Sequence, residues 1–326
     1  MPGEFERHAA TWMAWPARRE IWGDLFAEVK SDYASLAQTI ARFEPLYMVA
    51  NSADADEARR LCGARVTIIE YPINDSWARD SGPVFLVDDH GGLAASAWRF
   101  TAWGGKYFPH DQDAELARRI AAHLAVTVVA SDIALEGGAI LVDGEGTLIT
   151  TESCLLNANR NPGLSKHEIE AELIRVLGVR KVIWLPGDPL DVETDGHIDG
   201  LMALSAPARA LFETSDNRAD VRFEILRENR RALELQTDAR GRSFEIASIE
   251  EVDRALSRGD RYCRSYVNFY ILNDAVVAPA YGLPSDVRVE AVLRKAFTCR
   301  TIVMLPIGAI AVGGGGFHCI TQQQPT

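Results

Sequence analysis

The sequence predicts an α/β protein in which five similar units are arranged radially around one axis. Three observations support this. An amphipathic helix, a β-branched strand, a polar loop and a second apolar strand recur in that order, and an ionisable or amide residue recurs at the same point of each copy. Five units of about sixty residues fill the 326-residue chain without a Pro- or Ser-rich linker. Although a chain of this length often forms two domains, we expect a single domain over residues 1–326.

Four copies of the unit are clear along the chain. Their helices are expected at 58–61, 117–120, 173–177 and 292–296, and the strands that follow them at 66–69, 126–129, 181–185 and 301–305. The second strands, each after a loop with Asp or Gly, are expected at 84–86, 139–141, 197–202 and 317–321. A weaker copy lies between the third and the last, with a central strand at 266–272 and a preceding helix at 252–256.

The five polar positions are Asp80, Glu136, His197, Asn268 and Cys319, separated by 56, 61, 71 and 51 residues. No unit can bury its own apolar face, and radial stacking buries all of these faces. A doubly wound α/β sheet would also alternate strands and helices, but no Gly-x-Gly-x-x-Gly follows a first strand and the units resemble one another closely. We therefore expect the polar side chains to converge on the axis and to form one site.

The composition limits the classes of partner. The chain has 34 Lys and Arg against 46 Asp and Glu, a formal charge of −12, which argues against a nucleic acid or an anionic membrane and is compatible with a cationic ligand. The first residues contain no apolar signal region, and the longest apolar run, at 302–317, is too short and too interrupted to span a bilayer. A cytoplasmic protein that contacts neither nucleic acid nor membrane is expected.

The five cysteines lie far apart without a Cys-x-x-Cys pair, so the spacing indicates neither a disulfide framework nor a zinc finger. Cys319 stands out because it follows four glycines, which have no packing advantage and let backbone N–H groups approach a ligand. His318 is expected to be structural, since on a strand it would point away from the face of Cys319. Inert core residues are expected at Cys62, Cys154 and Cys299.

Two further motifs carry ionisable residues. On a strand, His197 and Asp199 would share one face, although such a pair is as often a satisfied surface pair. Arg79 could pair with Asp80, whereas pairing of Arg79 with Asp75 would leave Asp80 free.

The residues expected to converge are the carboxylates of Asp80, Glu136 and Asp199, one imidazole and one thiol. Crowded carboxylates raise the pKa of a thiol. A cation about 4 Å from the sulfur would offset this by about 4 kcal/mol at an effective dielectric of about 20, which is roughly three pKa units. A planar guanidinium suits such a site because its N–H groups match carboxylates in pairs. His197 would then protonate departing ammonia and activate the incoming water.

Several motifs resemble those of agmatine deiminases and, more broadly, of the bacterial peptidylarginine deiminase family of guanidine-modifying enzymes. They are Thr-Trp-Met-Ala-Trp-Pro at 11–16, Asn-Asp-Ser-Trp-Ala-Arg-Asp-Ser-Gly-Pro at 74–83, Trp-Gly-Gly-Lys-Tyr at 103–107, Glu-Gly-Gly at 136–138, Thr-Asp-Gly-His-Ile-Asp at 194–199, and the segment with four glycines, His and Cys at 313–325. The resemblance covers essentially the whole chain, and the last motif is its most specific part.

The resemblance implies a five-bladed α/β propeller, the pentein fold, with a pseudo-fivefold repeat of ββαβ units. It implies that agmatine and water give N-carbamoylputrescine and ammonia, a step toward putrescine, through an amidino intermediate on the nucleophile Cys319. His197 would be the acid and base, Asp80 and Asp199 would hold the guanidinium, and Glu136 would help to bind or orient it. No cofactor or metal is expected. The expectation of a homodimer rests on this resemblance alone. The substrate-binding positions would be Trp77, Asp195, Gly314 and Gly315.

Three places depart from the residues that are common in the family. The chain has Glu-Ile-Trp at 20–22 in place of Asp-Asn-Trp, Gly316 in place of Asn, and Thr101 near a usual Asn. These positions concern recognition of the far end of the substrate rather than the guanidine chemistry.

Three other interpretations stay open at the level of sequence. The substrate could be free or peptidyl arginine, whose carboxylate would need Arg79 or Lys106. The chain could be a non-catalytic pentein-like binding module. Finally, N, O and S donors suit zinc, and here they would come from His197, Asp199 and Cys319.

Overall fold

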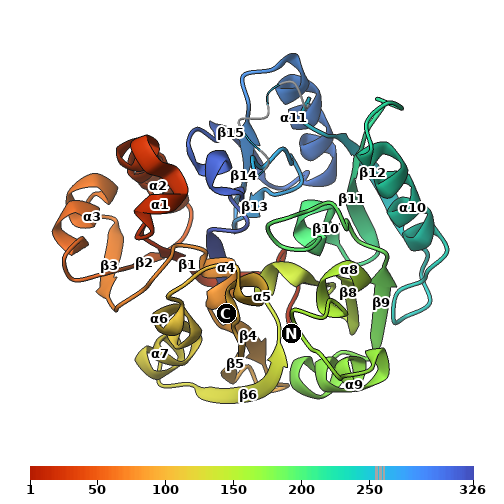
Figure 1. Cartoon of the computed structure of the whole chain (residues 1–326), viewed down its shortest axis with the longest axis horizontal. Coiled ribbons are helices and arrows are strands. Elements are labelled where there is room, and N and C mark those ends of the chain that lie inside the picture. The colour runs from red at the N-terminus through yellow and green to blue at the C-terminus, as the bar shows by residue number, and fades with distance from the viewer. Residues whose placement is uncertain (254–255, 257–258, 260) are drawn as a thin grey trace.

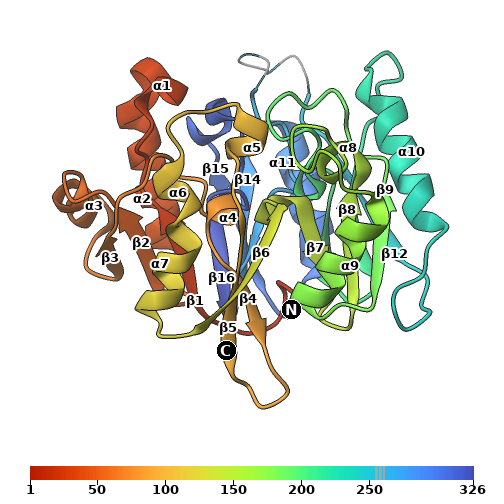
Figure 2. The same ribbon diagram turned by 60° about the horizontal axis from the view of Figure 1, so that its bottom comes forward.

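The fold is a ring of five small sheets in a computed structural model that describes residues 1–253, 256, 259 and 261–326. The sheets surround a common centre and the longer helices lie on the periphery, as Figure 1 shows down the axis and Figure 2 shows in a tilted view. This arrangement confirms the five-bladed α/β propeller.

Four of the sheets share one ββαβ order, in which an antiparallel hairpin is followed by a helix and by a third strand parallel to the middle one. The second sheet contains β4 (Val84–Val87), β5 (Leu93–Arg99), α7 (Leu116–His123) and β6 (Thr127–Ala134). The third contains β7 (Ile140–Val142), β8 (Thr147–Thr151), α9 (Lys166–Leu177) and β9 (Lys181–Leu185). The fourth contains β10 (Met202–Ala206), β11 (Arg209–Thr214), α10 (Arg222–Glu234) and β12 (Glu245–Glu250). The fifth contains β13 (Tyr270–Ile271), β14 (Ala275–Ala280), α11 (Pro284–Ala296) and β15 (Thr301–Pro306).

The first sheet closes the ring. Its strand order is β16 (Thr321–Pro325), β1 (His8–Ala14), β2 (Leu46–Ala50) and β3 (Val66–Glu70), with α2 (Phe26–Ile40) before β2 and α3 (Ala55–Cys62) before β3. β16 runs antiparallel to β1. Its hairpin is therefore built from distant segments, as in the hydrogen bond that Trp12 Nε1 donates to Gln324 Oε1 across 312 residues. Short helices lie in the connections: α1 (Arg19–Trp22), α4 (Ala78–Ser81), α5 (Ala102–Gly105), α6 (Asp111–Ala114) and α8 (Glu152–Leu155).

The repeat predicted from the sequence straddles two sheets. Its first strand is the last strand of one sheet and its second strand is the first strand of the next, so each polar position falls in a connection between sheets. In the weak copy, the helix at this point of the repeat is α10, and the first strand of the hairpin is only β13. The helix expected at 252–256 includes residues 254 and 255, which lie outside the described residues.

Two expected strand positions are wrong in detail. His197 and Asp199 belong to a 3₁₀ turn, η3 (Ile198–Gly200, with His197 as its N-cap), and His318 lies in a turn before β16. The reason is geometric: these residues sit where the chain crosses from one sheet to the next, so an extended strand cannot continue through them.

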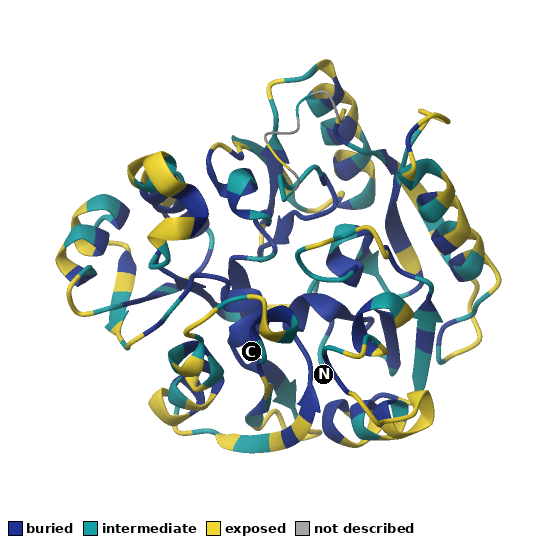
Figure 3. Cartoon of the chain, in the orientation of Figure 1, coloured by how far each residue is buried: buried dark blue, intermediate teal, exposed yellow. Residues whose placement is uncertain are grey.

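Apolar side chains fill the space between each sheet and its helices, whereas buried charges gather at the centre. Figure 3 shows burial along the inner strands and exposure along the peripheral helices. Arg79 and Arg160 are among the largest fully buried side chains. Because a buried charge must be paired, the polar contacts of the centre are constrained. Within the described ranges, no helix combines the length and the apolar character needed to cross a membrane.

Candidate active site

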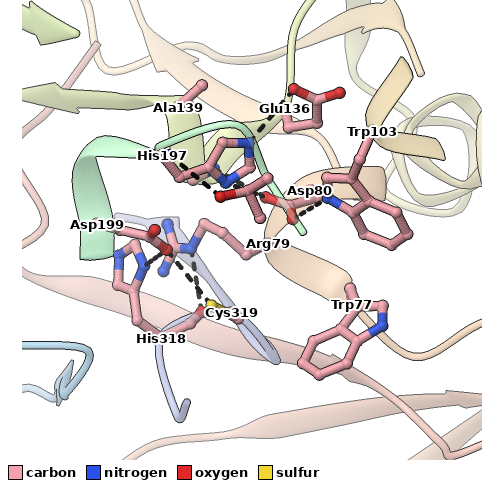
Figure 4. Close-up of polar contacts among 12 residues, drawn as sticks. Trp77, Arg79, Asp80, Trp103, Glu136, Ala139, His197, Asp199, His318 and Cys319 are labelled. Carbon is pink, nitrogen blue, oxygen red and sulfur yellow. Dashed lines mark hydrogen bonds and ion pairs between the residues drawn. The ribbon is translucent and has the colours of Figure 1, made fainter. Parts of the chain in front are cut away.

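The five recurring polar residues lie in the five connections between sheets. Asp80 is in α4, between β3 and β4, and Glu136 precedes the 3₁₀ turn η2 (Gly137–Ala139) between β6 and β7. His197 lies between β9 and β10, Asn268 between β12 and β13, and Cys319 between β15 and β16. Ring closure brings these connections to one end of the axis, and Figure 4 shows four of the five side chains facing one another.

Three side chains, those of His197, Asp199 and Asp80, approach one another beside the backbone of Gly138. A Cβ built on Gly138 would lie 2.6 Å from His197 Nδ1, 2.9 Å from Asp199 Oδ2 and 3.0 Å from Asp80 Oδ1. The Gly138 N–H donates a hydrogen bond to Asp80 Oδ1 at 2.9 Å. A residue with a side chain would displace these groups, so the glycine lets the Asp80 and Asp199 carboxylates and the His197 imidazole pack closely around its backbone.

The Cys319 sulfur lies beside one of these carboxylates. Its Sγ lies 3.5 Å from Asp199 Oδ2 and 3.4 Å from Asn268 Oδ1. Burial and the neighbouring Asp199 and Asp80 carboxylates raise the pKa of the Cys319 thiol well above its usual value. The resting residue is therefore a thiol rather than a thiolate, as expected for a sulfur among acids.

His197 is held between two acids. Its Nε2 lies 3.4 Å from Glu136 Oε2, and its Nδ1 lies 3.9 Å from Asp80 Oδ1. Burial opposes the charge, but Asp80, Cys154 and Glu136 together outweigh it and raise the pKa of His197 well above its usual value. Among the described residues Nδ1 has no hydrogen-bond partner, so the imidazolium keeps one N–H available for a substrate in the cavity that His197 lines.

Glu136 is directed at His197 by a buried arginine. Arg160 Nε donates to both carboxylate oxygens of Glu136, at 2.8 and 3.1 Å, and neither side chain is exposed. Burial would raise the pKa of Glu136, but His197 and Arg160 outweigh it and hold that pKa below its usual value. Glu136 is thus a carboxylate that orients the imidazole.

Asp195 is placed on the far side of the same arginine. Its Oδ2 accepts from Arg160 Nη1 and Lys106 Nζ at 2.8 Å each, and from Asn159 Nδ2 at 3.0 Å. It is absent from the described lining of the two cavities that meet at Cys319. Its polar capacity is used within the protein.

Asp80 and Asp199 differ in their partners. Asp80 accepts from Trp103 Nε1 at 2.9 Å, and burial together with Asp199 and Glu136 raises its pKa despite His197. Asp199 accepts from His318 Nδ1 at 2.9 Å, and this contact and neighbouring cations outweigh burial and lower its pKa. His318 therefore reaches into the centre instead of pointing away from it.

Arg79 pairs with neither of the acids considered from the sequence. Its guanidinium binds Glu4 Oε1 at 3.1 Å and Gln323 Oε1 at 2.7 Å, and Asp75 is paired with Arg18 instead. The reason is that Glu4, from the start of the chain, and Gln323, from its end, lie beside the Arg79 guanidinium. Both pairings considered from the sequence are therefore wrong, and Asp80 accepts from Trp103 and Gly138 instead.

An aromatic cavity leads to Cys319 and Asp80. Its walls include Trp77, Trp103, Tyr107 and the backbone of Gly313–Gly315. A Cβ on Gly315 would lie 2.3 Å from the Trp77 ring, so glycine is needed for the close approach of wall and floor. Gly314 and Gly315 thus line the cavity together with Trp77.

The three departures from the family pattern lie around this cavity. Ile21 contributes to its wall, and Trp22 stacks on Trp77 with centroids 5.9 Å apart. Thr101 caps α5 by accepting from the Gly104 N–H at 3.1 Å. A Cβ on Gly316 would lie 2.4 Å from Asn268 Oδ1, so a larger residue there requires a different position for Asn268.

Sequence reasoning missed several residues of the centre. Asn268 occupied a recurring polar position but received no role, and Trp103 appeared only inside a motif. Nothing local distinguishes Arg160, Glu4 or Glu193, whose partners are distant in the chain. Cys154 was interpreted as inert, but its sulfur lies within 4.8 Å of ligand atoms of Glu136 and His197, the one group of potential metal ligands found in the described ranges. A metal there would have to displace Arg160 from Glu136, and this group differs from the alternative zinc ligands considered from the sequence, which were His197, Asp199 and Cys319.

Comparison with known proteins defines the class of this protein. The model of the Porphyromonas-type peptidyl-arginine deiminase family matches residues 1–325, so the chain belongs to this family.

Comparison with individual relatives shows which members of the family this chain is similar to. The chain is 40% identical over 349 residues to the agmatine deiminase of Stutzerimonas stutzeri (strain A1501), and likewise to that of Pseudomonas aeruginosa (strain LESB58), covering all of this chain and 95% of each relative. The solved structure of the agmatine deiminase of Enterococcus faecalis matches with a TM-score of 0.94 at 35% identity, covering all of this chain and 95% of that one.

Proposed function

We propose that this protein is an agmatine deiminase, which converts agmatine and water to N-carbamoylputrescine and ammonia, a step toward putrescine, through a covalent intermediate on Cys319. The single observation that carries the proposal is the pair of cavities that meet at Cys319, which are lined by its thiol, the His197 imidazolium and the Asp80 and Asp199 carboxylates. A guanidinium matches these groups in charge and in its planar set of N–H donors. The names of the 40% identical relatives support agmatine as the substrate.

In the first step the substrate activates its own nucleophile. Asp80 and Asp199 bind the guanidinium, whose positive charge lowers the pKa of the adjacent Cys319 thiol, and the thiol proton leaves to solvent. The thiolate attacks the guanidinium carbon and a C–S bond forms. His197 Nδ1 gives its proton to one amino group, the C–N bond breaks, and ammonia leaves an amidino group on Cys319.

In the second step the neutral His197 accepts a proton from water. The hydroxide attacks the amidino carbon, the C–S bond breaks, and its electron pair returns to the Cys319 sulfur. The remaining O–H proton is lost to solvent, where ammonia takes it up. When the product leaves, the thiolate takes a proton back from solvent, so the cycle regenerates the imidazolium and the thiol, and no redox change occurs.

The aromatic cavity supports an amine at the far end of the substrate. Glu193 contributes a carboxylate to its wall and accepts from the Tyr107 hydroxyl at 2.5 Å. An ammonium can bind both a carboxylate and aromatic faces. Arginine is the second candidate, because Arg261 Nε lies 3.5 Å from Glu193 Oε1 and could bind a substrate carboxylate. Lys106 is held by Asp195 and the Glu193 carbonyl.

The test has two parts. Acid quench of the working enzyme followed by mass spectrometry should find the amidino group on Cys319, and C319S should release no ammonia. Ammonia release by C319S above about 1% of wild type contradicts the mechanism, since a serine hydroxyl is not ionised by so small a pKa shift. For the substrate, kcat/KM is compared for agmatine, arginine and a capped arginine peptide, and turnover of arginine equal to that of agmatine overturns the assignment.

The same proposal includes the domain organisation, the cellular location and the oligomeric state. The chain acts as one domain, because the site draws on every sheet of the ring. It works in the cytoplasm, in keeping with its charge and composition. A homodimer, supported by family likeness, is checked by light scattering.

A further inference from the structure

We propose that Arg160 is a positioning residue of the reaction, which holds Glu136 against His197 and ties that imidazole to the loop that forms the wall of the substrate cavity. This inference rests on the proposed function for the role of His197. Arg160 is absent from the described lining of the cavities that meet at Cys319, so it acts through other residues.

The first link runs from Arg160 to the imidazole. Arg160 Nε binds both oxygens of Glu136, at 2.8 and 3.1 Å, and Glu136 Oε2 lies 3.4 Å from His197 Nε2. Arg160 and Glu136 are completely buried. Without Arg160, the buried Glu136 would keep only one of the two cations that hold its pKa down, so it would take up a proton more readily, and a neutral Glu136 could not hold the imidazolium in place.

The second link runs from Arg160 to the loop at 101–107. Arg160 Nη1 donates to Asp195 Oδ2 at 2.8 Å, and the same oxygen accepts from Lys106 Nζ at 2.8 Å. A Cβ on Gly104 would lie 2.7 Å from Arg160 Nη1, so the backbone of the loop packs directly on the guanidinium.

This loop carries two residues of the substrate cavity. Trp103 Nε1 donates to Asp80 Oδ2 at 2.9 Å, and the Tyr107 hydroxyl donates to Glu193. Arg160 therefore connects the acid that orients His197 with the aromatic residues that contact the acids at the inner and outer parts of the cavity. Its planar fork is needed, because a single ammonium cannot reach Glu136 and Asp195 in the same geometry.

Two substitutions separate the charge of Arg160 from its geometry. R160K keeps a cation near Glu136 but loses the fork. We expect kcat to fall about tenfold with KM within twofold and with the pH profile in place. R160Q also removes the charge. The acid side of the kcat/KM profile should then move up by about two pH units and become steeper, because Glu136 takes up a proton in addition to Asp80.

Arg222 provides the matched control. It is also largely buried and binds three carboxylates, those of Asp188, Glu213 and Glu251. Although it lines one of the cavities that meet at Cys319, within the described part of the chain it makes no hydrogen bond or ion pair with His197. R222K should lower the melting temperature while kcat and the pH profile stay as in wild type. The His197 ring resonances, followed by NMR against pH, give a readout that needs no turnover, so failure of the proposed function does not obscure the result.

The outcomes decide the question. A lowered kcat in R160K together with a displaced His197 titration in R160Q supports a positioning role. If both variants fold, melt earlier and retain the wild-type kcat, pH profile and His197 titration, Arg160 is merely structural and the proposal is wrong. Should R160Q not fold, R160K and D195N, which loosens only the second link, carry the same test through kcat and the His197 resonances.

Discussion

Replacing Trp103 with Phe tests whether Asp80 sets the acid side of the pH profile. The indole N–H donates to Asp80 Oδ2 at 2.9 Å and Trp103 is almost completely buried. The bond favours the ionised carboxylate, so its loss raises the pKa of Asp80 further above its usual value. A hydrogen bond to a charged group contributes about 1.5–3 kcal/mol, and 1.36 kcal/mol corresponds to one pKa unit. The acid limb of the pH profile should therefore move up by about one to two pH units.

The assay is kcat/KM for agmatine from pH 4 to 9. Because a protonated Asp80 cannot bind a guanidinium by charge, W103F should lose rate at the acid end and approach wild type near the optimum. Phe100 provides the control, since its ring packs edge-on against Trp103 at 5.3 Å. F100L should weaken packing without moving the limb. A W103F profile with an unmoved acid limb and a lower optimum would show that Asp80 is not the group that titrates there.

Three other predictions concern the contacts beside Gly138, the buried Asp75 carboxylate and metal ions. G138A should fold normally but lose about 100-fold or more in kcat/KM, because its Cβ displaces His197; a value near wild type would mean that the side chains do not meet there. Burial and Asp113 raise the pKa of Asp75 to about 7, so folded protein keeps a proton that unfolded chain loses above pH 4. Wild type should therefore lose thermal stability relative to D75N as pH rises from 4 to 7, and a constant difference in melting temperature argues against this. Activity should be unchanged in EDTA; a loss that zinc restores would favour a metal at Glu136, Cys154 and His197.

Much of the fold follows from the sequence because the repeat is a local pattern. Each helix and β-branched strand has its own hydrophobic periodicity, and a polar residue between two strands recurs in every copy. The exception is the fourth copy. There the helix α10 consists largely of Arg and Glu and buries only Leu226, Asn229 and Leu233. Few apolar residues therefore mark this helix in the sequence, and the long spacing between polar positions makes the copy harder to recognise.

The candidate site is only partly accessible from sequence. The recurring positions identify Asp80, His197 and Cys319, because each faces the centre from its own connection. Partners of buried charges depend instead on which segments the ring brings together. Arg79 meets Glu4 from the start of the chain, and Arg160 meets Glu136 and Asp195 from two different connections. No local pattern predicts such pairs.

The closure of the ring by β16 and β1 makes the chemistry depend on one strand pairing. Cys319 lies two residues before β16, so its sulfur acquires Asp199 and Asn268 as neighbours only after that strand has docked. Before β16 pairs with β1, Cys319 lacks these neighbours and has the properties of an ordinary cysteine. Separation of β16 from β1 would abolish activity, although every residue that contacts the substrate would remain chemically intact.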